Sequence, residues 1–211
     1  MKRMSYADVY RSWDRCWKDF DGYNPIGKLT IGLAERLITE LLIELDLPED
    51  ASILDLGCGV GRTLQKFRVL GYYNAIGIDN SIESIRHCCA RGLSLDEDIF
   101  LMDGTQTTFS DGKFLLVFSE GVLEHFKDFS PFVREIVRLS KTYILLLQPN
   151  HFSVYGAVLN VVSHLFRSNI KEYSYHPRDF IDAFEREGCA LKMQRFTPLR
   201  EVVAQLFEVF P

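Results

Sequence analysis

Hydrophobic residues in the middle of the chain come in short runs separated by amphipathic stretches. Six runs have the length and apolar content of buried strands, namely 52–57, 75–79, 99–103, 114–119, 143–148 and 190–196. Helical periodicity fills the intervals at about 61–70, 80–91, 129–140 and 177–187. A further apolar run, 206–210, predicts a last strand that packs antiparallel. Strands that alternate with helices predict a doubly wound, mostly parallel α/β sheet covered on both faces.

Polar residues and prolines mark the expected starts of three helices. Ser130 followed by Pro131 is typical of an N-cap with proline at the first helical position, and Pro177 opens the last helix in the same way. Asn80, with Glu83 three residues later, has the spacing of a capping box. We therefore expect these helices to begin close to those positions.

Two amphipathic helices precede the alternating region, and a third apolar segment interrupts it. The first helix carries apolar and aromatic residues at helical spacing, at Tyr6, Val9, Tyr10, Trp13, Trp17 and Phe20. An apolar stripe from Ala34 to Leu45 predicts the second helix, which stops near Pro48. The segment 151–166 predicts a helical lid. It either roofs a pocket for an apolar or aromatic acceptor together with the N-terminal aromatics, or belongs to the core.

The size and composition predict a single globular domain. With 211 residues, 47% of them hydrophobic and 25% charged, the chain has the values of an ordinary folded protein. We divide it into N-terminal cap helices (1–50), a ligand-binding core (51–150), the lid (151–176) and a C-terminal helix with strands (177–211). The net charge of −5 disfavours a broad nucleic-acid interface. The sequence leaves a monomer and a homodimer open.

The cysteines and the N-terminus favour a cytoplasmic protein. The number of cysteines, five, is odd and none forms a C-x-x-C pair, which disfavours a disulfide framework or a thiolate zinc site. The N-terminal residues are basic but lack the apolar core of a signal peptide. The least charged stretch, 151–166, is too short and too polar to span a bilayer.

A glycine-rich turn follows the first predicted strand and points to a nucleotide-like ligand. Gly57, Gly59 and Gly61, with Cys58 between them, permit a tight turn that a ligand can approach closely. The position of the third glycine in a dinucleotide fingerprint is Arg62. Asp55 would repel a pyrophosphate and attract a cationic ligand. S-adenosylmethionine, with an ammonium and a sulfonium and no phosphate, fits this charge.

Acidic residues after the next two strands suit the rest of that ligand. Asp79, 22 residues after Gly57, is placed to accept hydrogen bonds from ribose hydroxyls, or else to cap the following helix. Asp103, before Gly104, either takes an adenine amino group or serves a turn. We also expect Asn80, Gly104, and Ser119 with Glu120 at the end of the fourth strand to contact the cofactor.

Four ordered motifs resemble the class I S-adenosylmethionine-dependent methyltransferases, in particular the small-molecule type 11 branch. They are ILDLGCGVGR (53–62), GIDNS (77–81), the MDG turn (102–104) and FSEGVLEHF (118–126). The resemblance implies a seven-stranded sheet with an antiparallel last strand. It also implies that Gly57 and its neighbours hold the methionyl end, Asp79 the ribose and Asp103 the adenine. The chain departs from the family at 114–117 (FLLV for FDLV) and 107–109 (TTF for LPF), neither of which touches these residues.

Candidate catalytic residues lie directly after the fourth strand. Glu120, Glu124 and His125 are possible general bases or loop anchors; we take His125 and Glu120 as the catalytic candidates. Glu120 and Glu124 would share a helix face if a helix began at once. Metal-binding methyltransferases have E-x-x-E-H here, but position 121 is Gly, so we predict no metal. The segment also lacks the proline and aromatic residue that amino-group DNA methyltransferases place there.

The sequence therefore predicts a methyltransferase that moves a methyl group from S-adenosylmethionine to a small molecule, at an O, N or C atom. A catalytically silent S-adenosylmethionine-binding regulator or partner protein is the alternative. A nicotinamide oxidoreductase would have the same fold, but the spacing of the glycines and the charge of Asp55 do not suit its dinucleotide.

Overall fold

The computed structural model describes residues 5–18, 20, 22, 25–157 and 172–210. Its helices are α1 (Tyr6–Lys18), α2 (Pro25–Leu45), α3 (Arg62–Val69), α4 (Ile82–Ala90), α5 (Ser130–Leu139) and α7 (Pro177–Arg186), with a short 3-10 turn η1 (Leu123–His125). Its strands are β1 (Ile53–Leu56), β2 (Ala75–Asp79), β3 (Ile99–Leu101), β4 (Phe114–Glu120), β5 (Ser140–Pro149), β6 (Cys189–Phe196) and β7 (Val202–Val209).

The strands form one seven-stranded sheet in the order β3-β2-β1-β4-β5-β7-β6. Strands β1 to β5 pair in parallel, whereas β7 runs antiparallel to both β5 and β6. The mostly parallel sheet and the antiparallel last strand predicted from the sequence are thus confirmed. The winding reverses between β1 and β4, and in such sheets ligands bind beyond the carboxyl ends of the strands at this reversal.

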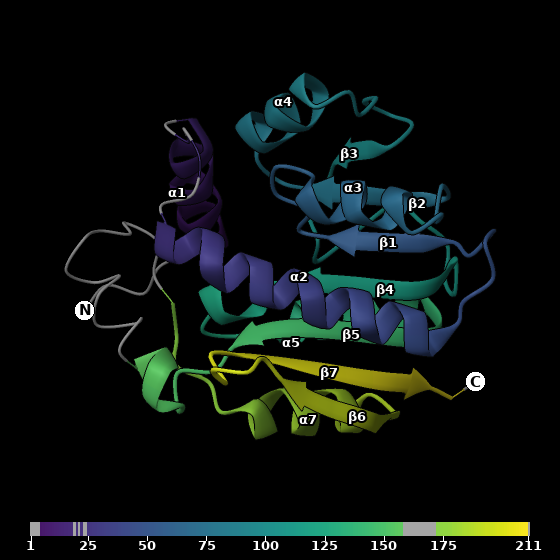
Figure 1. Ribbon diagram of the computed structural model, residues 1–211. Coiled ribbons are helices and arrows are strands. Elements are labelled where there is room, and N and C mark those ends of the chain that lie inside the picture. Colours follow the sequence, from purple (N-terminus) through teal and green to yellow (C-terminus); the bar gives the residue numbers. More distant parts are fainter. Residues whose placement is uncertain (1–4, 19, 21, 23–24, 158–171, 211) are drawn as a thin grey trace.

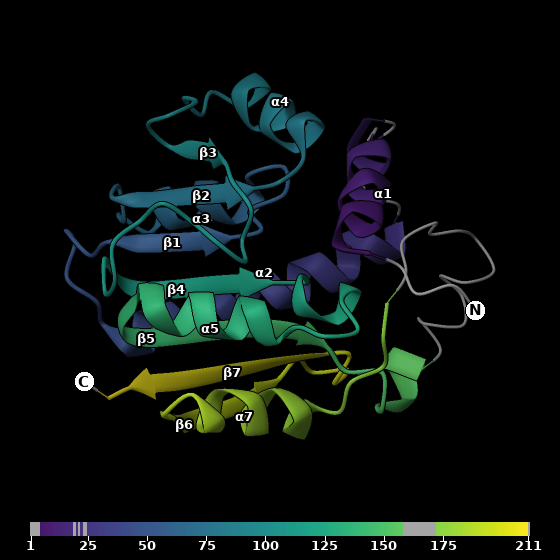
Figure 2. The same ribbon diagram turned by 180° about the vertical axis from the view of Figure 1, so that it is seen from behind.

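Helices cover both faces of the sheet. Helices α2 and α3 lie over one face (Figure 1), and α5 and α7 lie over the other, which Figure 2 shows from behind. The alternation of side chains along β1 accounts for this arrangement, since Ile53 belongs to the apolar core on the α2 side and Leu54 to the core on the α5 side. Helix α1 stands at the edge where the parallel strands end, separate from both covering layers.

The last strand is longer than the sequence predicts. It begins at Val202 rather than at 206, because the polar Gln205 interrupts the apolar pattern. The structure shows that Gln205 is fully buried, and its amide donates to the carbonyl oxygen of Pro177 (2.8 Å) and to the side chain of Gln194 (3.1 Å). Because its amide nitrogen is paired in this way, the polar Gln205 can occupy a buried strand that has no continuous apolar signal.

Three local predictions about helix and strand ends were wrong. Strand β3 ends at Leu101, so Asp103 lies in the following turn. The N-cap of α4 is Ser81 rather than Asn80, since the Ser81 hydroxyl accepts from the amide of Ser84 (3.2 Å). The N-cap position of α5 is Phe129, one residue before Ser130. Pro177 does open α7, where His176 and Asp179 form a capping box.

The predicted lid lies for the most part outside the described residues, since 158–171 are not among them. Residues 154–157 are helical, and Phe152 and Val154 are exposed.

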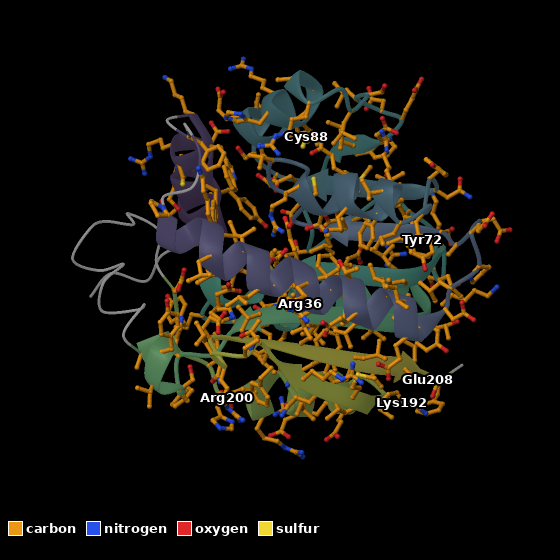
Figure 3. All side chains as sticks on the ribbon, in the orientation of Figure 1. Arg36, Tyr72, Cys88, Lys192, Arg200 and Glu208 are labelled. Atoms are coloured by element: carbon orange, nitrogen blue, oxygen red, sulfur yellow. The ribbon has the colours of Figure 1, made fainter. Side chains whose placement is uncertain are left out.

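Within the described ranges, each helix is too short or too polar to cross a bilayer. At the end of the sheet far from α1, Lys192 of β6 and Glu208 of β7 form a salt bridge of 2.8 Å (Figure 3).

Candidate active site

The glycine turn after β1 has a backbone shape that other residues adopt only with strain. Gly57 and Gly59 have φ of +80° and +52°, in the left-handed region. A Cβ at Gly57 would lie 2.3 Å from Cγ2 of Val122, so the turn packs directly against the segment after β4. The amides of Gly57 and Cys58 donate to the carbonyl oxygen of Ile78 at 2.9 and 3.0 Å. The turn is therefore fixed by β2 on one side and by Val122 on the other.

Asp79, the last residue of β2, holds two backbone segments together. Its Oδ2 accepts from the amide of Gly59 and its Oδ1 from the amide of Ser81, each at 2.9 Å. Burial raises the pKa of Asp79 above its usual value, while these amide hydrogen bonds oppose that shift. The carboxylate thus anchors the glycine turn and the start of α4 at once.

Asp55 is a buried carboxyl group with an unsatisfied oxygen. Its side chain is 2% exposed, and its Oδ2 has no hydrogen-bond partner among the described residues. Burial raises the pKa of Asp55 well above its usual value, Glu120 and Asp79 add to the shift, and Arg62 opposes it. A ligand that brings an N–H donor and positive charge would relieve both the unsatisfied oxygen and the repulsion.

The carboxylate of Glu120 is hydrogen-bonded to side chains of α3. Its Oε2 accepts from Arg62 at 2.6 Å and from the hydroxyl of Thr63 at 3.3 Å. Arg62 also donates to Glu35 of α2 at 3.0 Å. Glu120 ends β4 and η1 begins only at Leu123, so Glu120 and Glu124 do not share a helix face. The guanidinium of Arg62 instead ties β4 to α2 and α3.

A cavity of about 770 Å³ collects most of the residues predicted from the sequence. It is lined by His125 and by the predicted cofactor residues Asp55, Gly57, Cys58, Gly59, Asp79, Asn80, Gly104 and Glu120. Gly61, Asp103 and Ser119 do not belong to its lining. Asp103 accepts from the hydroxyl of Tyr10 at 2.8 Å and from the amide of Thr105 at 2.8 Å, whereas Ser119 donates to the carbonyl oxygen of Leu56 at 3.0 Å. These two side chains are therefore hydrogen-bonded to neighbouring residues of the protein rather than exposed in the cavity.

Helix α1 and the residue Phe20 after it close the cavity with an aromatic wall made of Tyr10, Trp13, Trp17 and Phe20. Trp17 lies on the glycine turn, since a Cβ at Gly59 would be 3.2 Å from its ring. Trp13 stacks on Trp17, with ring centroids 5.5 Å apart, and meets His125 edge to face at 4.8 Å. The predicted amphipathic helix thus packs its aromatic face toward the strand ends, where Figure 1 shows α1.

Polar contacts fix α1 to the cofactor side of the sheet. Oδ1 of Asp14 accepts from the hydroxyl of Ser81 at 2.8 Å and from the amide of Glu83 at 3.2 Å. Nε2 of His87 lies 2.8 Å from the carbonyl oxygen of Trp17. Sequence patterns do not reveal these contacts because they join residues about 70 positions apart.

Buried polar groups occupy the part of the cavity after β4. Glu124 and His125 are each 3% exposed, with Oε1 of Glu124 and Nε2 of His125 3.8 Å apart. The amide of Tyr173 donates to the carbonyl oxygen of Glu124 at 2.7 Å, and Glu172 also lines the cavity. Glu172 was not expected from the sequence, because no motif connects it to Glu124. A second cavity of about 340 Å³ shares His125 and Phe126 with the first.

Comparison with known proteins identifies the central part of the chain. A family model described as a methyltransferase domain matches residues 54–143, which run from β1 into β5. This segment, which is less than half of the chain, is similar to that methyltransferase family. The similarity supports S-adenosylmethionine, the cofactor predicted from the sequence.

Two curated relatives of this chain come from Rauvolfia serpentina. Ajmaline N-methyltransferase is 28% identical over 184 residues, which are 79% of this chain and 59% of that protein. Norajmaline N-methyltransferase is 31% identical over 133 residues, which are 56% of this chain and 45% of that protein. The chain thus spans about half to three-fifths of the length of these relatives.

A solved structure shares the fold over nearly the whole chain. Magnesium protoporphyrin IX methyltransferase from Synechocystis PCC 6803, solved with bound S-adenosylhomocysteine, superposes with a TM-score of 0.70. The match covers 95% of this chain and 94% of that one, at 18% sequence identity. The seven-stranded architecture is therefore that of a known methyltransferase structure.

The residues of the cavity fit S-adenosylmethionine. The unsatisfied Oδ2 of Asp55 suits an ammonium group, and the glycine turn leaves room for a ligand to approach its backbone. Across the described ranges, no three His, Cys, Asp or Glu side chains gather in a way that would hold a metal ion. Glu120 of the sequence EGVLEH is paired with Arg62.

Proposed function

We propose that the protein transfers a methyl group from S-adenosylmethionine to a small-molecule acceptor. The observation that carries this proposal is the single cavity in which the glycine turn, Asp55 and Asp79 adjoin an aromatic wall and the polar segment after β4. A cofactor held by the first set of residues would leave the second set to receive an acceptor. A cavity of about 770 Å³ has the size of a small-molecule site.

Bound S-adenosylmethionine supplies a methyl group that is already activated on a sulfonium sulfur. The protein then has to hold the acceptor in line with that methyl group and keep water out. Asp55 and Asp79 would bind the cationic and ribose parts, and Trp13 and Trp17 would exclude water. Because Arg62 holds Glu120, we assign Glu120 to the cavity wall, and we keep His125 as a candidate base on the acceptor side.

Both curated relatives are named for methylation of nitrogen, which supports a nitrogen acceptor here. The alternative, a silent cofactor-binding protein, would have the same glycine turn and Asp79. A turnover experiment separates the two.

The test is a transfer assay with S-adenosylmethionine labelled in the methyl group and a library of small amines, phenols and carboxylic acids. We expect label in an extractable product, and much less label with Asp79→Ala. Cofactor binding without any labelled product would support the silent alternative and contradict the proposal.

A further inference from the structure

Carboxyl groups outnumber basic side chains among the described residues that line the cavity. Five carboxyl groups line it, those of Asp55, Asp79, Glu120, Glu124 and Glu172, and among the described lining residues Arg62 is the only Lys or Arg. That guanidinium is already paired with Glu120 and Glu35. S-adenosylmethionine adds one net positive charge, from an ammonium and a sulfonium less one carboxylate. The site therefore disfavours an anionic acceptor and favours a cationic one.

Glu124 places one of these carboxyl groups on the acceptor side of the cavity. It is 3% exposed, and its Oε2 has no hydrogen-bond partner in the described part of the chain. Burial raises the pKa of Glu124 well above its usual value, and Glu172 and Glu120 add to the shift. An unsatisfied buried carboxyl oxygen is costly, and an N–H donor from a ligand would satisfy it.

The walls around Glu124 suit an ammonium group on an apolar scaffold. Trp13, Tyr10, Phe126 and Phe132 line the same cavity. Trp13 packs edge to face on His125, the residue next to Glu124, with ring centroids 4.8 Å apart. Aromatic faces attract cations, and most strongly so at sites removed from water. Phenols and alcohols would gain neither this attraction nor the charge interaction.

We propose that the acceptor is a basic amine on an apolar or aromatic scaffold, and that Oε2 of Glu124 accepts a hydrogen bond from its N–H and then its proton. This inference rests on the proposed function, since it names the acceptor class of the same site. It also makes Glu124, rather than Glu120, the carboxylate that accepts a proton from the acceptor.

The proton and electron balance of the step is closed by Glu124. One N–H proton of the bound ammonium passes to Oε2, which turns the carboxylate into a carboxylic acid and the ammonium into a neutral amine. The nitrogen lone pair then forms the N–CH₃ bond, while the C–S bond breaks and its electron pair stays on sulfur. The product is a methylated ammonium, and the proton on Glu124 later leaves to solvent. A carboxyl group with a raised pKa is suited to accept such a proton.

Binding to the protein saturated with S-adenosylhomocysteine tests the inference without turnover. We would titrate three pairs that differ in one group, namely tryptamine with tryptophol, phenethylamine with phenethyl alcohol, and tetrahydroisoquinoline with isochroman. We expect the amines to bind about tenfold more tightly than their oxygen counterparts, as a hydrogen bond to a charged group provides. This arm needs no variant, and equal or weaker binding of the amines would overturn the inference.

Variants then assign the preference to one carboxyl group. Glu124→Gln keeps the shape and removes the charge, so we expect the amine preference to fall below threefold while S-adenosylhomocysteine affinity changes less than twofold. Glu124→Asp keeps the charge and should retain part of the preference. Glu208→Gln, at the far end of the sheet, is the matched control and should leave the preference intact (Figure 3). A full preference in a Glu124→Gln protein that binds S-adenosylhomocysteine would overturn the role of Glu124.

The outcomes also separate this inference from the proposed function. Labelled methyl transfer to hydroxyl or carbon acceptors but to no amine would leave the proposed function standing and remove the inference. Absence of S-adenosylhomocysteine binding to the unaltered protein would remove both.

Discussion

The two halves of the cavity are built in different ways. The cofactor half consists of the glycine turn, Asp55 and Asp79, all within 25 residues of the chain and held mainly by backbone hydrogen bonds. The acceptor half is assembled from side chains of α1, the segment after β4 and the residues before α7. Local backbone geometry thus shapes the proposed cofactor half, whereas contacts between distant segments shape the proposed acceptor half. Substitutions should therefore separate the two halves.

The largest effect is expected from Gly57→Ala. The new Cβ would lie 2.3 Å from Cγ2 of Val122 at a φ of +80°. Left-handed strain and overpacking together cost about 2 to 5 kcal/mol, so S-adenosylhomocysteine affinity should fall at least about tenfold by calorimetry. Gly71→Ala is the matched control, since Gly71 has a φ of +93° with open space around it and lies away from the cavity. Equal losses of affinity in both variants would contradict the role of the turn.

The next effect is expected from Asp79→Ala. The change removes the carboxylate that accepts from Gly59 and Ser81 and that is placed for the ribose. The loss of hydrogen bonds to a charged group should weaken S-adenosylhomocysteine binding by about 1.5 to 3 kcal/mol. Asp50→Ala, an exposed turn residue, provides the control. An unchanged dissociation constant in Asp79→Ala would show that the ribose assignment is wrong.

Asp55→Asn should make the ligand-free protein more stable and the cofactor bind less well. Because burial raises the pKa of Asp55, the folded state binds its proton more tightly than the unfolded state does. Stability is therefore lost as the pH rises from the ordinary carboxyl pKa through the raised value. Removing the charge should raise the free energy of unfolding by about 1 to 3 kcal/mol at pH 8 and by much less at low pH. Thermal unfolding measured across this pH range tests the prediction.

Glu135 provides the opposite case to Asp55. Burial alone would raise its pKa, but hydrogen bonds from Arg138 and Thr107 lower it overall. The stability due to Glu135 is thus present above its ordinary pKa and is lost as the pH falls. Glu135→Gln should therefore lower the unfolding temperature at neutral pH. The electrostatic account would be contradicted if Glu135→Gln raised stability at pH 8. A loss of stability in Asp55→Asn at the same pH would contradict it as well.

The smallest effect is expected from Tyr10→Phe on the acceptor side. The change removes the hydrogen bond from Tyr10 to Asp103 that ties α1 to the turn after β3. One such bond is worth about 1 kcal/mol, so thermal unfolding should shift by a few degrees. S-adenosylhomocysteine affinity should change less than in Asp79→Ala. Tyr73→Phe, at an exposed residue, should change neither, and an equal shift there would contradict the docking role of Tyr10.

The same division explains what the sequence predicts well. The glycine turn and Asp79 act through chain-local geometry, so their spacing alone places them in one site with Asp55. The positions of the strands along the chain follow from the apolar runs, apart from the start of β7, which the buried Gln205 conceals.

Long-range contacts are what the sequence does not show. Asp103 has the position of a ligand residue, yet Tyr10 and Thr105 engage its carboxylate. Glu120 looks like a free base, but Arg62 and Thr63 hold it. Glu172 meets Glu124 only because the chain returns to the cavity before α7. Such partners depend on tertiary packing, which no local pattern encodes.

Calorimetry on the unaltered protein with S-adenosylhomocysteine and with NADH tests the central claim most directly. The buried acid beside the glycine turn should favour an amino-acid nucleoside over a pyrophosphate. We predict binding of one S-adenosylhomocysteine per chain and no measurable heat with NADH at the same concentrations. Tighter binding of NADH, or no heat with S-adenosylhomocysteine, would contradict the account.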